Sequence, residues 1–309
     1  MRKNRLRCGR VEAADADLAT FAELLVVKSS IAVRVALYNA ERQRLATRPV
    51  RTDAPLELVF RGRYGAYYGT PAGVTKAKEL CDAALHADPN LGAAMVCKAE
   101  MIVEGLDQGP NPARAPLVRE ADDLTRRAVA IDANDAVAWR VRAEALRYQY
   151  QWDAALEANS RAIQLDPSRV GNLDNRALYM AWTGRPEDVF PLIARASTIS
   201  PTNVGFDQRV ACRAYLALGH YEEAIASCER SATEDEYWTV HFYLAAAYAQ
   251  KGLLAKAAVE KDKALRLKPE ATLVWYGELL RQVSDNEKAW QQYKTFIEPG
   301  LVKAGFPAK

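Results

Sequence analysis

The sequence has few of the residues that build disulfide and metal sites. Its 309 residues include three histidines and five cysteines, and no two cysteines form a CxxC pair. An odd number of cysteines without such a pair argues against a disulfide framework and against a zinc site. We therefore expect reduced thiols and a cytoplasmic location.

An excess of charge and long apolar runs are also missing. The 42 basic and 39 acidic side chains leave a net charge of +3, which gives no reason to propose a nucleic-acid partner. The apolar run LLVVKSSIAVRVALY is broken by Lys28 and Arg34, and no segment reaches the roughly 20 uncharged residues that span a bilayer. Residues 1–10 are basic and precede an acidic, polar stretch, so we interpret them as a solvated tail and expect no membrane partner.

Sequence signatures of catalysis are absent as well. The chain has no P-loop, GxSxG or HExxH motif, and GRYGAYYG at 62–69 lacks the GxGxxG spacing. The three histidines are scattered, and we interpret His220 and His241 as structural. We therefore expect no enzyme activity, with no catalytic residue, cofactor or metal.

What the sequence does contain is an internal repeat. Segments such as AIQLDPS and ALRLKPE recur, and each closes on Pro or a substitute, at Pro89, Ala133, Pro167, Pro201, Glu236 and Pro269. The differences between successive closing positions are 44, 34, 34, 35 and 33. A helix–turn–helix period of about 34 residues with a terminal proline is the signature of the tetratricopeptide repeat. The longer first spacing places about ten extra residues in LDQGPNPARAPL (106–117), which we interpret as a loop.

Small residues recur at fixed positions within each repeat. The unit 136–169, for example, has Ala143 in its first helix and Ala155 and Ala162 in its second. Small side chains in these positions let two antiparallel helices approach closely. Cys212 and Cys228 occupy two such positions on facing helices, and we interpret them as small apolar core residues, with a disulfide or redox switch as the alternative.

The pattern predicts an all-α fold, a right-handed α-solenoid of about six helix pairs with N-terminal helices and a C-terminal helical cap. Residues 1–10 form the tail, 11–57 an N-terminal region of one or two helices with a linker, and 272–309 the capping helices. The repeats between them occupy 58–91, 92–135, 136–169, 170–204, 205–237 and 238–271.

A narrower resemblance extends from about residue 15 to the end of the chain. The order DADLATFAELLVVKSS, LELVFRGR, RVACRAYLALGHYEEAIASCER, HFYLAAAYAQKG and GLVKAGFPAK resembles the regulatory tail of bacterial signalling proteins. In those proteins a class III adenylate or guanylate cyclase domain, or a winged-helix domain, precedes the repeats. The resemblance implies a regulatory or interaction region detached from its effector domain. One alternative is a fragment of a longer cyclase-type protein.

The repeats also predict a partner-binding groove. In the tetratricopeptide family, the positions one residue past each buried stripe of the first helices line the concave face. Here these positions include Arg140, Glu144, Arg147, Asp174, Leu178, Arg209, Arg213 and Phe242. Because Arg grips carboxylates through two parallel hydrogen bonds, we hypothesise that the four arginines contact an acidic protein or peptide segment and that Phe242 is an apolar anchor.

Other interpretations of the groove stay open. The arginines could only solvate the face, or pair with Glu144 and Asp174. Chaperone-binding members of the family clamp a C-terminal carboxylate with Lys and Asn, and Glu144 and Leu178 stand here where that clamp has Asn, so we do not expect a chaperone. A groove for a small molecule or glycan is the remaining alternative, with stacking surfaces from Trp139, Trp152, Trp182 and Trp238.

Overall fold

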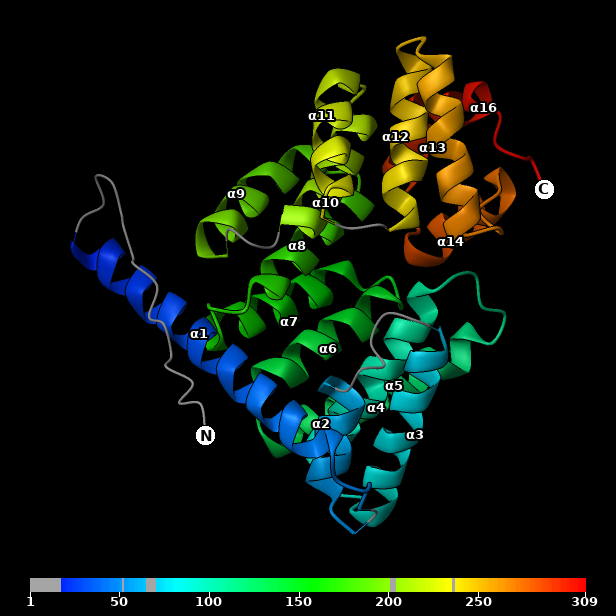
Figure 1. The fold of residues 1–309 in the computed structure, drawn as a ribbon. Coiled ribbons are helices and arrows are strands. Elements are labelled where there is room, and N and C mark those ends of the chain that lie inside the picture. Colours follow the sequence, from blue (N-terminus) through cyan, green and yellow to red (C-terminus); the bar gives the residue numbers. More distant parts are fainter. Residues whose placement is uncertain (1–17, 52, 65–70, 201–203, 235–236) are drawn as a thin grey trace. The chain divides into compact units, whose positions relative to one another are not determined.

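The computed structural model describes residues 18–51, 53–64, 71–200, 204–234 and 237–309 (Figure 1). Every regular element among them is a helix, as an all-α solenoid requires. The chain divides into two compact parts, each described by itself: the N-terminal part has residues 1–146 and 157–169, and the C-terminal part has 147–156 and 170–309. The tail at 1–10, which contains Cys8, lies outside the described residues. The same is true of Gly65, Tyr68, Pro201 and Glu236.

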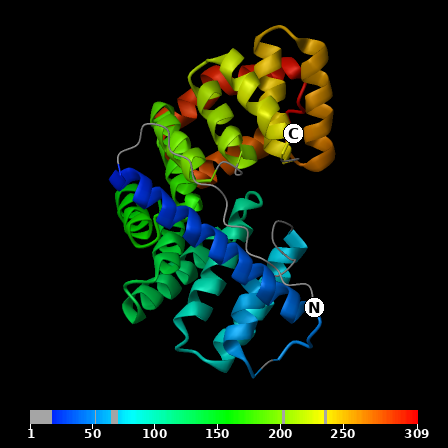
Figure 2. The same cartoon turned by 60° about the vertical axis from the view of Figure 1, so that its left-hand side comes forward.

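The N-terminal part begins with one long helix and continues in helix pairs. Its helices are α1 (Leu18–Ala46), α2 (Pro55–Tyr64), α3 (Pro71–Ala87), α4 (Gly92–Asp107), α5 (Arg114–Ile131), α6 (Ala136–Arg147) and α7 (Trp152–Leu165). Arg147 of α6 and residues 152–156 of α7 belong to the C-terminal part. The sequence predicted one or two helices before the repeats, and α1 is a single continuous helix there (Figure 2).

The C-terminal part contains three further helix pairs and the elements that follow them. These are α8 (Val170–Trp182), η1 (Pro186–Asp188), α9 (Val189–Ile199), α10 (Val204–Ala217), α11 (Tyr221–Ala232), α12 (Trp238–Gln250), α13 (Leu254–Leu267), α14 (Leu273–Val283), α15 (Glu287–Gln292), the π-helix η2 (Tyr293–Ile297) and α16 (Glu298–Ala304). Among the described residues, no helix is both long and apolar enough to cross a membrane.

The small residues of the repeat pack between the paired helices. Each is almost completely shielded from solvent, with at most 1% exposed: Ala77, Ala84, Ala143, Ala155, Ala162, Ala177, Ala196, Cys212, Ala224, Ser231, Ala245, Ala257 and Ala264. The closing prolines act as predicted, because Pro89, Pro167 and Pro269 each follow the end of a second helix by two residues. The loop predicted at 106–117 is shorter, because α5 already begins at Arg114.

The prediction of reduced thiols is wrong. Cys81 of α3 is bonded to Cys97 of α4, and Cys212 of α10 to Cys228 of α11. Adjacent antiparallel helices bring the Cα atoms of the pairs to 5.5 and 5.3 Å, which is within the reach of a disulfide. Both pairs are separated by 16 residues, a shared spacing that the prediction overlooked.

Candidate partner-binding groove

The predicted groove residues divide between the two parts of the chain. Arg140 and Glu144 belong to the N-terminal part, and the C-terminal part holds Arg147, Asp174, Leu178, Arg209, Arg213 and Phe242. Asp174 and Leu178 are four residues apart on α8, as are Arg209 and Arg213 on α10, so each pair shares one helix face. We call Asp174, Leu178, Arg209, Arg213, Phe242 and Ala246 the first-helix stripe.

In the N-terminal part, Arg140 is held by an acidic residue of its own chain. Glu100 of α4 is buried between two guanidinium groups: Arg63 Nε donates to its Oε2 at 2.7 Å, and Arg140 Nη2 donates to its Oε1. Burial alone raises the pKa of the Glu100 carboxyl, but the two positive charges outweigh it and lower that pKa to about 2. From the sequence, only Glu144 and Asp174 were expected as internal partners, and this triad was not predicted. Glu144 itself is buried.

Two arginines of the C-terminal part stack on aromatic rings. The guanidinium carbon of Arg147 lies 4.0 Å from the ring centre of Tyr148 and 4.6 Å from that of Trp182. Arg209 lies 4.9 Å from the ring of Phe206 and 4.3 Å from that of Tyr237. These distances are typical of cation–π contacts, which fix the orientation of the guanidinium groups.

Arg213 differs from the other three in that no described carboxylate or aromatic ring contacts its guanidinium group. Its side chain is buried, with 7% exposed, and its Nη1, like that of Arg147, is buried without a hydrogen-bond partner among the described residues. No carboxylate of the described chain forms an ion pair with it, in contrast to Arg140. A buried charge without a counterion is costly, so it calls for a physical explanation.

Three tyrosines are clustered in the same part. The hydroxyls of Tyr243 (α12) and Tyr276 (α14) are 2.7 Å apart, and the ring centres of Tyr276 and Tyr293 (η2) are 5.4 Å apart. Burial raises the pKa of both Tyr276 and Tyr293, so both phenols are neutral donors; the charge of Arg213 acts on Tyr276 in the opposite direction. The Tyr293 hydroxyl is buried and has no partner among the described residues.

These tyrosines were not predicted from the sequence. One signal was available for Tyr276, because it occupies the same position as Phe242 one repeat later. The position of Tyr293 had no comparable signal, since it lies beyond the repeats.

The other end of the stripe is covered by the chain itself. Residues 284–306, which we call the C-terminal strap, contact α8 through Ser284, α10 through η2, and α12 through η2 and α16. Gly300 lies against the backbone of Ala246, and the ring of Phe306 is centred 4.8 Å from that of Phe242. Phe242 is completely buried in these contacts. It is therefore an anchor for the strap in this structure.

The strap is fixed at several further points along the first helices. Ser284 Oγ donates to the Trp182 carbonyl at 2.5 Å, and Gln250 Nε2 donates to the Phe296 carbonyl at 3.2 Å. The space beside Gly219 is filled by the Phe296 ring. Successive turns of the strap thus meet successive repeats.

The remaining candidate residues have partners within their own part. His241 Nδ1 is 2.6 Å from Glu260 Oε2, which places this histidine in a buried pair. Trp152 Nε1 donates to Asp285, and Trp139 Nε1 donates to the Ala133 carbonyl. Trp238 packs against the ring of Phe242. With Trp182 under Arg147, all four tryptophans of the glycan hypothesis make internal contacts.

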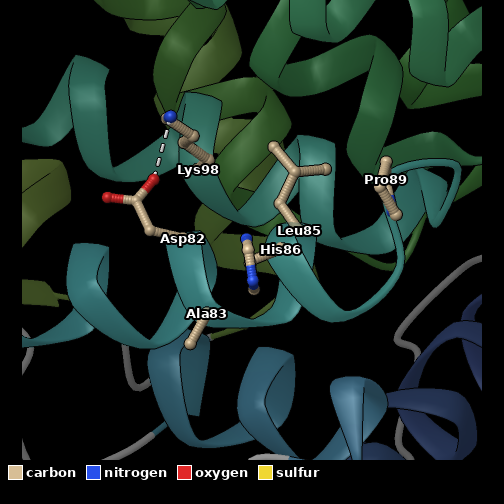
Figure 3. Close-up of a pocket in the computed structure, with 6 residues that line it drawn as sticks. All are labelled: Asp82, Ala83, Leu85, His86, Pro89 and Lys98. Carbon is tan, nitrogen blue, oxygen red and sulfur yellow. Dashed lines mark ion pairs between the residues drawn. The ribbon is translucent and has the colours of Figure 1, made fainter.

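A separate open hollow lies on α3 and α4 of the N-terminal part (Figure 3). It is lined by Asp82, Ala83, Leu85, His86, Pro89 and Lys98. Lys98 Nζ pairs with Asp82 at 2.9 Å and with Glu120 at 2.7 Å, and Lys78 Nζ pairs with Asp82 at 3.3 Å, so two lysines balance two carboxylates at its rim. Within the described ranges, no group of three or more His, Cys, Asp or Glu side chains is placed to hold a metal ion.

Comparison with solved structures shows what kind of fold this is. The human IFIT1 dimer with m7Gppp-AAAA superimposes with a TM-score of 0.62 at 16% identity, over 95% of this chain and 71% of that one. The Cut9–Hcn1 assembly of APC/C gives a TM-score of 0.58 at 14% identity, over 87% of this chain and 49% of that one. The fold is a tetratricopeptide-type α-solenoid.

A bacterial structure agrees with this assignment. PilF of Pseudomonas aeruginosa matches with a TM-score of 0.50 at 16% identity, over 77% of this chain and 96% of that one. No protein-family model matches the sequence. No curated protein sequence matches it either. At these low identities the similarity establishes the fold alone.

Proposed function

We propose that the protein is a non-enzymatic scaffold that binds an acidic segment of a partner protein along the first-helix stripe. The fold supports this proposal, because a tetratricopeptide-type solenoid offers an extended surface. A place in bacterial signalling rests on the sequence resemblance to regulatory tails.

The observation that carries the proposal is the strap. One end of the stripe already accepts a polypeptide segment, and Tyr293, Ile297, Leu301 and Ala304 of that segment are buried at helical spacing. Binding an amphipathic helix in a groove is a common mode of peptide recognition. The stripe is therefore suited to segments of this kind.

The rest of the stripe defines the character of the partner. Leu178 and Arg209 are half-buried, and Arg213 follows Arg209 by one helical turn. An apolar contact at Leu178 beside two guanidinium groups is complementary to a segment that combines apolar and acidic side chains. The partner segment would lie along the half-buried residues of the stripe, Leu178 and Arg209.

The test compares two charge-reversed variants with each other. R209E/R213E should lose the partner that the wild type captures from cell extracts, whereas R195E/R230E, which changes two exposed arginines of α9 and α11, should keep it. Circular dichroism checks that both variants fold, and R209M/R213M serves if charge reversal prevents folding. A synthetic peptide of an acidic segment from the captured protein must also compete with that protein for binding. Unchanged capture by R209E/R213E contradicts the proposal.

A further inference from the structure

We infer that Arg213 is a receptor for one carboxylate group, which the guanidinium holds together with the phenol hydroxyl of Tyr293. This inference rests on the proposed function, because the carboxylate would come from the partner segment. It adds a specific binding atom, a ligand charge and two further residues, Tyr276 and Tyr293, to that function.

The first step is the missing counterion. Within this chain, the half-buried arginines Arg63 and Arg140 share the carboxylate of Glu100. Arg213 is more deeply buried, and among the described residues no hydrogen-bond acceptor meets its Nη1. Taking a charged group out of water costs several kcal/mol unless an opposite charge and hydrogen bonds compensate. An external anion supplies both.

The second step is the set of groups around Arg213. Helix α10 packs against α12 and against η2, which carry Tyr243 and Tyr293. Tyr276 connects them, because its hydroxyl meets that of Tyr243 and its ring meets that of Tyr293. The Tyr293 hydroxyl is a second buried group without a partner among the described residues. A guanidinium and a neutral phenol are both hydrogen-bond donors, so together they suit an acceptor-only ligand.

The third step is the charge of the ligand. The Arg213 guanidinium supplies one positive charge, the phenols around it are neutral, and the negative charge of Glu298 acts on Tyr293. A single carboxylate pairs with the guanidinium charge. A phosphate dianion would add a second negative charge in the same buried place, which is unfavourable. The site therefore fits a carboxylate better than a phosphate.

The experiment measures thermal unfolding of the full chain with small probes at equal ionic strength and pH 7. N-acetylglutamic acid α-amide carries a side-chain carboxylate, N-acetylalanine carries a terminal carboxylate, and N-acetylglutamine amide is the neutral control. A probe whose free concentration is ten times its dissociation constant raises the folding equilibrium constant about 11-fold. We expect a carboxylate probe to stabilise the protein in this way and the neutral probe to have no effect. The carboxylate probe that stabilises more strongly shows whether the bound carboxylate comes from a side chain or from a chain terminus. Inorganic phosphate should act more weakly.

Variants locate the effect. R213M should lose the carboxylate-specific stabilisation, weakening the probe at least tenfold, and should be at least as stable as wild type without a probe, because a buried charge is removed. Y293F should weaken the probe several-fold, and R195M, in an exposed position on α9, should behave as wild type. If R213M fails to fold, R213K keeps the charge without the planar fork and should bind more weakly.

Three results would overturn the inference: equal stabilisation by the neutral probe, a carboxylate effect that survives in R213M, or stronger stabilisation by phosphate. The readout requires no partner protein. Failure of the carboxylate site and failure of partner capture can therefore be distinguished.

Discussion

Gly300 lies directly on the backbone of Ala246. A Cβ atom at Gly300 would be only 3.0 Å from the Cα and carbonyl carbon of Ala246, and closer still to its carbonyl oxygen. The strap can approach α12 to this extent because residue 300 has no side chain. This contact is the closest approach of a strap glycine to the first-helix stripe, and it explains why α16 covers Ala246 and Phe242.

The first prediction concerns this contact. G300A should destabilise the protein by about 1–3 kcal/mol, because the added methyl group meets backbone atoms that cannot rotate away. Urea unfolding measures the change. G171A in α8 is the matched control: a Cβ there meets no atom within 4 Å, so alanine should leave stability unchanged or raise it by up to about 1 kcal/mol. Equal stability of G300A and wild type would contradict the described packing.

The second prediction concerns the thiols. Five cysteines with two disulfides leave one thiol, so titration of the unfolded, unreduced protein should find one thiol per chain and five after reduction. Five thiols before reduction would restore the original expectation of a reduced protein.

The third prediction concerns the contribution of one disulfide to stability. Replacing both Cys212 and Cys228 with serine should cost about 3 kcal/mol, the magnitude expected for a loop of about 15 residues, and a reducing agent should lower the melting temperature of the wild type. C8S is the control, because Cys8 takes part in neither bond. A melting temperature that is independent of reducing agent would argue against stabilising disulfides.

The fourth prediction concerns acid. The pKa of Glu100 is lowered from its ordinary 4.5 to about 2, so its ionised form stabilises the fold fully above about pH 4.5. This contribution, about 3 kcal/mol, should be lost as the pH falls from about 4.5 towards 2. Urea unfolding at several pH values should therefore show a steep loss for wild type in this window and a flatter profile for E100Q.

The control for this pH dependence is E79Q, which changes an exposed carboxylate of α3 that pairs with Lys76. Its pH profile should follow that of the wild type. An E100Q profile as steep as that of the wild type would show that the Arg63–Glu100–Arg140 triad does not stabilise the fold.

The repeats could be predicted from the sequence because their determinants are local. A helix ends at Ala87, Leu165 or Leu267 because a proline stands two residues later, and the small residues recur with the same period as the helices they separate. Both signals are visible within the sequence of a single repeat and its neighbour. The strap is different: its apolar spacing indicates a capping helix, but nothing local indicates that it turns back to meet Trp182.

The partners of the charged residues were equally hidden. Arg140 pairs with Glu100, 40 residues earlier, and the sequence offered the nearer Glu144 as a candidate. Arg213 was predicted to contact a partner from its spacing alone; its burial and unpaired Nη1 are visible only in the structure. Whether Arg213 and Leu178 contact a partner stays a prediction.

Site-specific photo-cross-linking shows directly whether the first-helix stripe binds the partner. A photoreactive amino acid at Leu178 on the stripe, with one at exposed Val259 on α13 as the control, reports which face meets the partner. We predict that position 178 forms a cross-link to an acidic segment, that R209E/R213E abolishes it, and that position 259 forms none. A cross-link from 259 alone, or one from 178 that persists in R209E/R213E, would show that the partner does not bind through the first-helix stripe.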